Sequence, residues 1–437
     1  MKKKCNKIKW LGLILLCFIK TSAQQTLTLE DAVKIALENN YDIRIAANHS
    51  KITQADNTLG NAGMLPTVNA SVVDNNGIQN LSQTRADGTT NSLDNAKNNS
   101  LTYGANLNWT IFDGFRMFAR RDQLKELEKL GDIRLKQTIL QKVSDVMAIY
   151  YDLVQQQQQL AALDSTIVIS RQRLTLAQNR YTIGKASKLE TLNAEVDLNT
   201  DTTTLLRQKE LFARTKIELN EQLARDTKLD FKVSEEIQID NQLLLANLNE
   251  LASKQNPEVE ALVLNKRISE LQLKQIKGNR YPRVQLNTGY NFNESRSDLG
   301  FATRTSSQGL NYGFSATLPI FDGFNQHRNE KVAQLQVANS QIAIEQQNKT
   351  LESQLAAAFQ TYQTNLELVK LEEKNQAIAK QNLEITLEKF RIGTIPTIEF
   401  RTAQLNYINA KVRFTGTQYQ AKLSEIALKE LAGNLGF

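Results

Sequence analysis

Short sequences recur along this chain in a fixed order, and this repetition constrains the fold more than any single segment does. Two of the matches lie 209 residues apart and the third lies 216 residues apart. A tandem duplication with one change of loop length produces such a pattern. We therefore expect an internal tandem repeat, with residues 24–235 as the first copy and 236–437 as the second. The matched sequences are IFDGF at 111–115 and 320–324, RYTIG at 180–184 and KFRIG at 389–393, and LPTV at 65–68 and YPRV at 281–284.

Residues 1–23 have the layout of an export signal. A lysine-rich start, the apolar run WLGLILLCFI at 10–19 and small residues before Gln24 are typical of a secretory signal peptide. An uncleaved anchor is the alternative, although ten apolar residues are short for a membrane span. Both cysteines, Cys5 and Cys17, lie in this segment, so we expect a mature chain without disulfides or thiolate metal sites.

The net charge of +7 belongs to the same segment. Residues 1–23 hold six of the 53 Lys and Arg residues and none of the 46 acidic residues, which leaves the remainder at about +1. A near-neutral chain does not favour a nucleic-acid partner, and we expect none. Nothing after residue 23 approaches 18 consecutive apolar residues, so a secreted soluble protein and an outer-membrane β-barrel both remain open.

Each repeat contains two stretches that alternate between apolar and polar residues. They follow Pro66 and Pro282, which are suited to the junction between a helix and a strand, and they predict β-hairpins at about 66–112 and 282–321. The polar face carries Asn, Thr, Ser and Gly, which suits a wet lumen better than the dry core of a soluble sandwich. We therefore favour strands that cross a membrane. The aromatic residues of the apolar face are Tyr103, Trp109, Tyr290, Phe292, Tyr312 and Phe314.

Helical sequence fills the rest of each repeat. Short helices open the repeats, with Thr28 placed as an N-cap in the first. Apolar residues then recur every three or four positions over some 66 residues without proline, which corresponds to a helix of about 100 Å. A shorter helix returns from each glycine-containing sequence. The predicted long helices are at about 115–181 and 324–390, and the return helices at about 187–225 and 397–431.

No group of residues in this chain indicates catalysis. His49 and His327 have no plausible third ligand nearby, so each is better explained as a surface residue than as a metal ligand. Gly184-Lys185 does not complete a phosphate-binding loop, because Asn179 stands where the first glycine would be. We expect no enzyme activity, no cofactor and no metal.

Four strands cannot span a bilayer alone, because the two edges would leave unpaired backbone groups in hydrocarbon. Two copies of the chain would supply eight strands and three copies twelve, and both numbers allow a closed barrel. The expected architecture is a shared barrel that continues into a helical tube.

The chain resembles the TolC family of outer-membrane efflux proteins over essentially its whole mature length. Each matched sequence is weak alone, but their order, duplication and spacing together are specific. The residues that carry the resemblance are the opening LTLEDA at 27–32, Leu65-Pro66 and Tyr281-Pro282, Phe112-Asp113-Gly114 and Phe321-Asp322-Gly323, and the glycine-containing sequences at 180–184 and 389–393.

The resemblance implies a mixed α and β fold in a homotrimer, with a twelve-stranded transmembrane β-barrel continued by a periplasmic α-helical barrel. It implies an outer-membrane location in a Gram-negative bacterium, in contact with outer-membrane lipid. A periplasmic adaptor would link the protein to an inner-membrane pump, and the channel itself would be the passive exit duct of a tripartite efflux or type I secretion system. The alternative is a soluble exported coiled-coil protein with a structural or interaction role.

The resemblance also implies where function would reside. The tips of the helical hairpins would dock the adaptor, although each tip glycine could serve only the turn. Glu190 and Glu399 would form an acidic ring in the lumen near the entrance, with an ordinary solvated acid as the alternative. In this chain Phe390 and Ile395 replace the family's tyrosine and arginine, so its closed-state lock does not carry over, although Arg391 is nearby. The expected tip residues are Ile183, Gly184, Leu189, Ile392, Gly393 and Ile398.

Structural roles are expected where strands and helices meet. Pro66 and Pro282 would mark the passage from helix to strand. In each repeat the sequence Phe-Asp-Gly would mark the passage back, with the aspartate capping helical amides and the glycine allowing the turn. These barrel-to-helix joints are Phe112, Asp113 and Gly114 in the first repeat and Phe321, Asp322 and Gly323 in the second.

Overall fold

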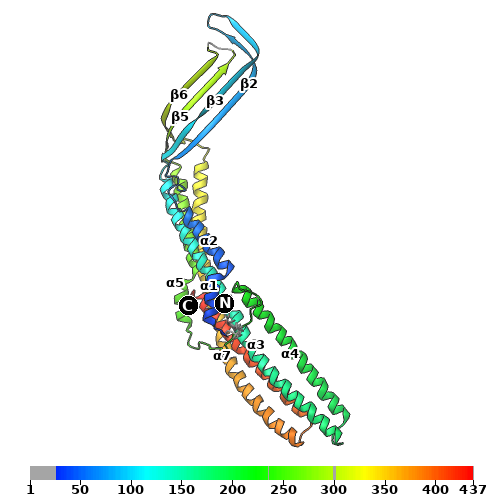
Figure 1. Cartoon of the computed structure of the whole chain (residues 1–437). Coiled ribbons are helices and arrows are strands. Elements are labelled where there is room, and N and C mark those ends of the chain that lie inside the picture. The colour runs from blue at the N-terminus through cyan, green and yellow to red at the C-terminus, as the bar shows by residue number, and fades with distance from the viewer. Residues whose placement is uncertain (1–25, 235, 299–301, 437) are drawn as a thin grey trace, which may run out of the picture.

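The protein is elongated, with a β-sheet at one end and two helical hairpins at the other (Figure 1). The computed structural model describes residues 26–234, 236–298 and 302–436, and the expected leader at 1–23 lies outside them. Both ends of the described chain lie near the middle of its length. None of the helices within the described ranges is long and apolar enough to cross a membrane.

The sheet is antiparallel, with strand order β2-β3-β5-β6. The register places Val68 opposite Leu107 and Trp109 opposite Leu286. Tyr103 lies opposite Phe292, and their rings stack at 4.9 Å. Strands β2 and β6 form the two edges of this sheet. The strands are β2 (Thr67–Thr84), β3 (Thr90–Phe112), β5 (Arg283–Ser297) and β6 (Arg304–Thr317).

The apolar face of the sheet is open to its surroundings. Val72 is 75% exposed, Tyr312 78% and Phe314 71%. The polar face is hydrogen-bonded within itself, and Asn291 donates to Asn106 across strands β5 and β3 at 3.0 Å. Because exposed aromatic side chains are costly in water, this distribution favours contact with lipid.

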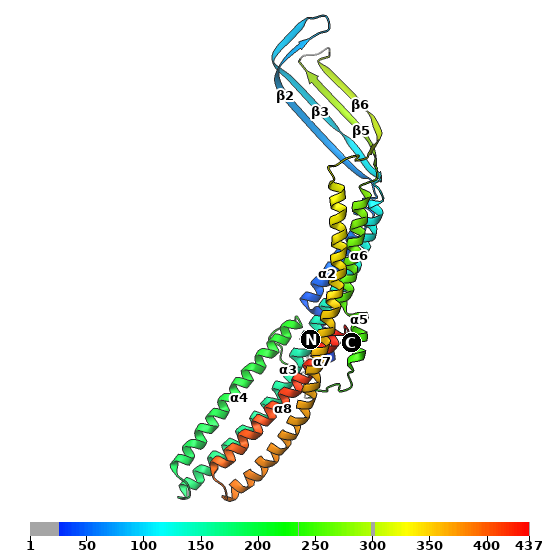
Figure 2. The same ribbon diagram turned by 180° about the vertical axis from the view of Figure 1, so that it is seen from behind.

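Four helices extend from the sheet or return part of the way towards it (Figures 1 and 2). The two longest contain 67 and 68 residues, which corresponds to about 100 Å each. In the lower half the helices lie side by side in the order α4, α3, α8, α7. These helices are α3 (Arg116–Thr182), α4 (Lys188–Gln222), α7 (Asn325–Ile392) and α8 (Thr397–Leu431).

Short helices cover the upper half, where α6 packs against both α3 and α7, and α2 packs against α3. Asn40 caps α2 by accepting from Asp42 and Ile43, and Asn256 caps α6 in the same way. The two short strands pair in parallel. These elements are β1 (Thr26–Leu27), α1 (Leu29–Asn39), α2 (Tyr41–Asp56), β4 (Lys232–Val233), α5 (Leu245–Gln255) and α6 (Pro257–Gly278).

The largest core lies at mid-length, where α1, α3, the ends of α4 and α8, and the β1–β4 pair meet. Tyr150 is 2% exposed there and donates a hydrogen bond to the carbonyl of Leu27 at 3.0 Å. At the start of α1, Thr28 accepts from the amide of Asp31 at 3.1 Å.

One boundary differs from the sequence-based expectation. The second hairpin was expected to reach residue 321, but β6 ends at Thr317. Strand β3 continues to Phe112 because that residue pairs with Val284 on β5. The matching residues 318–321 follow a strand whose outer edge has no neighbour, so no ladder hydrogen bonds hold them extended.

Candidate entrance at the helical tips

The hairpin tips expose the apolar side chains that the sequence singled out. Ile183 and Leu189 are 66% and 65% exposed beside the turn from α3 to α4, and Ile392 and Ile398 are 74% and 72% exposed beside the turn from α7 to α8. Exposed apolar residues at two adjacent tips suit contact with another protein.

Both turns are built in the same way. Gly184 has φ +71° and Gly393 has φ +83°, a left-handed conformation that glycine adopts without penalty. The amide of Lys185 donates to the carbonyl of Arg180 at 2.8 Å, and the amide of Thr394 donates to that of Lys389 at 3.0 Å. These bonds close the ends of α3 and α7, so each glycine has a structural role whatever else it does.

A buried ion pair connects the two hairpins above the tips. Arg401 on α8 donates two hydrogen bonds to Asp201 on α4, both at 2.8 Å. Ser170 on α3 donates to the same carboxylate at 2.6 Å, and Gln404 donates to Ser170 at 2.9 Å. Arg401 and Asp201 are only 7% and 6% exposed. Three helices are therefore held together by one charged network.

The network continues towards the tips through Arg173, which is 2% exposed and pairs with Asp197. Sequence analysis missed all these residues. The residues three and four positions from Asp201 include the polar Asp197 and Thr204, so helical periodicity did not mark this position as buried.

Phe390, which stands where the TolC family has a tyrosine, is packed inside the second tip. It is 1% exposed and stacks on Phe400 at 4.9 Å. Arg180 lies over its ring at 5.1 Å and donates to its carbonyl at 3.0 Å. Arg391 instead forms a surface pair with Glu388 at 2.8 Å. Aromatic packing and an arginine from the first hairpin thus stabilise the second tip.

The two expected lumen acids have different environments. Glu190 is half-buried and accepts a hydrogen bond from the Thr397 hydroxyl at 2.5 Å, which joins the starts of α4 and α8. Glu399 is exposed. Glu399 is therefore the more accessible of the two carboxylates, while one oxygen of Glu190 is engaged within the chain.

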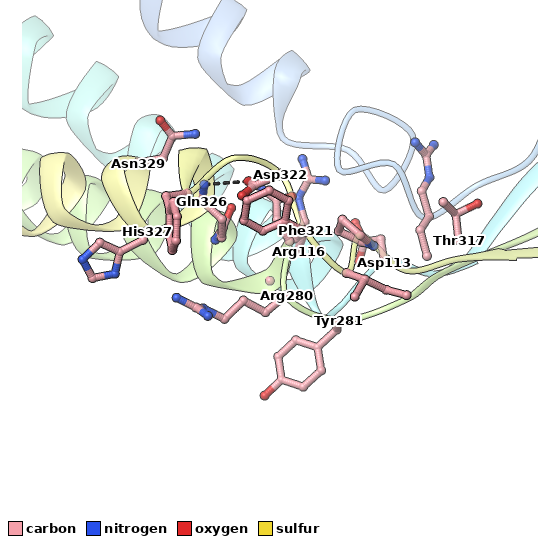
Figure 3. Close-up of a pocket in the computed structure, with 16 residues that line it drawn as sticks. Asp113, Arg116, Arg280, Tyr281, Thr317, Phe321, Asp322, Gln326, His327 and Asn329 are labelled. Carbon is pink, nitrogen blue, oxygen red and sulfur yellow. Dashed lines mark hydrogen bonds between the residues drawn. The ribbon is translucent and has the colours of Figure 1, made fainter.

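The barrel-to-helix joints share one backbone design. Asp113 accepts from the amide of Met117 at 3.1 Å, and Asp322 accepts from that of Gln326 at 2.7 Å (Figure 3). The residue at the N-cap itself is Phe115 or Phe324, with φ +65° or +63°. The aspartate therefore caps a first-turn amide from two residues before the N-cap.

The surroundings of the two joints differ. Gly114 is buried, and a Cβ there would lie 2.1 Å from the carbonyl oxygen of Gly278 and 2.9 Å from the Cβ of Tyr281. Gly323 is exposed, and its neighbours Asp322 and Phe324 line a cavity of about 710 Å³ that is also lined by Asp113 of the first joint (Figure 3). At its rim Arg280 donates to Glu330 at 2.5 Å, and this hydrogen bond lowers the pKa of the Glu330 carboxyl.

Comparison with known proteins decides the family. The family described as "Outer membrane efflux protein" matches residues 32–225 and 248–434. The chain belongs to the outer membrane efflux protein family. The resemblance seen in the sequence is thereby confirmed, and so is the outer-membrane location. The alternative of a soluble exported coiled-coil protein does not fit this family.

Individual relatives are distant in sequence but similar in fold. Protein CyaE of Bordetella pertussis is 22% identical over 416 residues, which cover 94% of this chain and 85% of the relative. The CmeC outer membrane channel of Campylobacter jejuni superposes with a TM-score of 0.76 at 18% identity, covering 93% of this chain and 85% of that one. The MtrE outer membrane channel of Neisseria gonorrhoeae gives 0.73 at 15%, covering 93% and 89%.

Members of this family are transport channels and not enzymes. His49 and His327 are both exposed. Within the described ranges no group of three or more His, Cys, Asp or Glu residues could hold a metal ion.

Proposed function

We propose that this chain is one third of an outer-membrane exit duct. Three copies form a twelve-stranded barrel that crosses the membrane and a helical tube that extends into the periplasm. Substrate moves through it passively, from a periplasmic adaptor and an inner-membrane pump to the outside. The similarity in fold to the CmeC and MtrE outer membrane channels supports this role.

The observation that carries the proposal is the pair of open edges on the sheet. Strands β2 and β6 each have one neighbour within the chain, while the apolar face of the sheet favours lipid. An open edge cannot lie in hydrocarbon, so other copies must supply the missing neighbours. Pairing of β6 with β2 of the next copy is head-to-tail, and a head-to-tail contact that closes produces a ring.

The total surface supports the same conclusion. The chain exposes 28,318 Å², whereas a compact monomer of its mass, 49.3 kDa, exposes about 17,000 Å². Outer helices α4 and α7 carry exposed apolar side chains along their open flanks, as a helix does when a partner covers it. These include Leu189, Leu192, Val196 and Leu206 on α4, and Leu368, Leu371, Ile378 and Ile385 on α7.

The exposed tip residues are proposed to meet the adaptor, because they lie at the end farthest from the sheet. The duplicated turn would present two similar surfaces from each copy. Three copies would then offer six such surfaces around one axis.

Purified protein in a planar lipid bilayer tests the proposal. We expect a discrete ion conductance from a species with the mass of three chains. A verified outer-membrane protein that is monomeric, or a trimer that conducts no ions under any applied voltage, would contradict it.

A further inference from the structure

In the upper half of the molecule, two matched helices differ in how many long helices they pack against. Helix α6 packs against α7 on one flank and α3 on the other, whereas α2 packs against α3 and has an exposed opposite flank. Two contacts establish the match between these helices. Thr53 of α2 lies against Gly131 of α3, and Ser269 of α6 lies against Ser340 of α7, with hydroxyl oxygens 3.2 Å apart.

These residues keep the spacings of the sequence repeat. Thr53 and Ser269 are 216 residues apart, and Gly131 and Ser340 are 209 residues apart. Because α2 matches α6 in the repeat, the contact of α6 with α3 predicts an equivalent contact between α2 and the helix that matches α3. The helix matched to α3 is α7, and its free flank lies on the far side of the chain from α2, so it must come from another copy.

The two surfaces that would meet in this equivalent contact are both apolar. Within the chain, Gln275 of α6 donates to Gln123 of α3 at 3.0 Å. The matched residues are Leu59, in the turn that follows α2, and Val332 of α7, which are 47% and 56% exposed. A polar pair inside one chain thus corresponds to an apolar pair that the single chain leaves uncovered.

Both exposed residues belong to longer stripes. Ile45 and Ile52 lie seven residues apart on α2, a spacing that keeps them on one face, and Leu59 follows seven residues later in the turn after the helix. On α7, the exposed Val332, Leu335 and Ile342 are separated by three and seven residues, spacings that also keep them on one face. Their counterparts on α6 and α3 are buried or half-buried where those helices meet; these are Ala261, Ile268 and Gln275, and Gln123, Glu126 and Ile133.

The cavity described above, which is lined by Phe321 and Phe324 of the second joint and by residues 278–281 beside the first, fits the same comparison. The first joint is filled by residues 278–281, which pack on Gly114. The segment that matches 278–281 at the offset of 216 residues is 62–65, which follows α2. Leu65 is 54% exposed, and Phe321 and Phe324 beside the cavity are 75% and 74% exposed. By this match, residues 62–65 of a second copy would pack at the second joint as residues 278–281 pack at the first.

We propose that the exposed flank of α2 and the turn after it, through residues 62–65, dock in one copy on the α7 stripe and the second joint of the next, with Leu59 against Val332. This seam rests on the proposed function, since it assigns the residues that join neighbouring copies just below the membrane. It is a second, helical connection in addition to the pairing of β6 with β2.

Cysteine cross-linking in intact outer membranes tests the seam. The chain's only cysteines, Cys5 and Cys17, lie in the expected leader, so introduced cysteines have no background. Leu59→Cys with Val332→Cys, joined by a short bis-maleimide, should give species of two and three chain masses on a denaturing gel. The single variants should give neither species.

Two matched controls accompany it. Gln123→Cys with Gln275→Cys reproduces the contact inside one chain and should be linked without any increase in mass. Leu59→Cys with Ile378→Cys places the second thiol on the same helix, about 70 Å lower, and should not be linked.

The outcomes separate the seam from the function. If the native protein is a trimer but the Leu59 and Val332 pair gives only single chains, the seam is wrong and the proposed duct stands. If the native protein is a monomer in the membrane, both proposals are wrong.

Discussion

Asp201 and Arg401 lie 200 residues apart in the sequence and form the most buried ion pair between the two hairpins. Removing one partner of a buried pair leaves a charge without compensation, which costs about 3–5 kcal/mol. We expect Arg401→Met to lower the temperature at which the assembled protein dissociates on a gel. The pair holds α4 to α8, so its loss in Arg401→Met should let the two hairpins separate more easily. We therefore also expect this variant to have a larger single-channel conductance.

The matched control is Arg401→Met combined with Asp201→Leu. Replacing both members of a buried pair by apolar residues is often neutral or stabilising. The double variant should therefore recover most of the lost thermal stability. If the single variant were as stable as the wild type, the ion-pair network would not contribute to the stability of the protein.

Glu430 gives a pH-dependent prediction. Burial raises the pKa of its carboxyl, while the hydrogen bond from Ser144 at 2.6 Å opposes that rise. A raised folded-state pKa means that the ionised carboxylate costs stability at neutral pH, and that this cost disappears as the pH falls through the folded-state pKa. Glu430→Gln should raise the melting temperature at pH 7.5 and lose that advantage in acid. Exposed Glu195→Gln is the control and should change little.

At the scale of elements, the two hairpin turns should tolerate only residues that accept a left-handed backbone. Other residues pay about 1–2 kcal/mol for that conformation. We expect Gly184→Trp with Gly393→Trp to leave the trimer intact but to abolish adaptor-dependent export, measured by complementing a strain that lacks this chain. Asparagine at both positions fits the same backbone and should retain export. Wild-type export by the tryptophan variant would reject the docking role of the tips.

Elements whose signal is local could be predicted from the sequence, and elements that depend on distant neighbours could not. The alternation before Phe112 predicts a strand and the helical period after Phe115 predicts a helix, since both patterns lie within one segment. The end of β6 at Thr317 depends on an absent neighbouring strand. The pairing of Asp201 with Arg401 depends on how two hairpins lie together, and helical periodicity carries no information about which buried polar residues meet.

At the scale of the whole molecule, the proposed arrangement of three copies around one axis would convert a single exposed acid into a ring. Glu399 is exposed at the start of α8, whereas Glu190 is held by Thr397. Close carboxylates around a pore favour cations and disfavour anions. We therefore expect Glu399→Gln to reduce the cation selectivity of the channel, measured as a shift of reversal potential under a salt gradient. Glu190→Gln should have the smaller effect, because its carboxylate is already engaged within the chain. Unchanged selectivity in Glu399→Gln would remove Glu399 from the ion path, and the expected acidic ring with it.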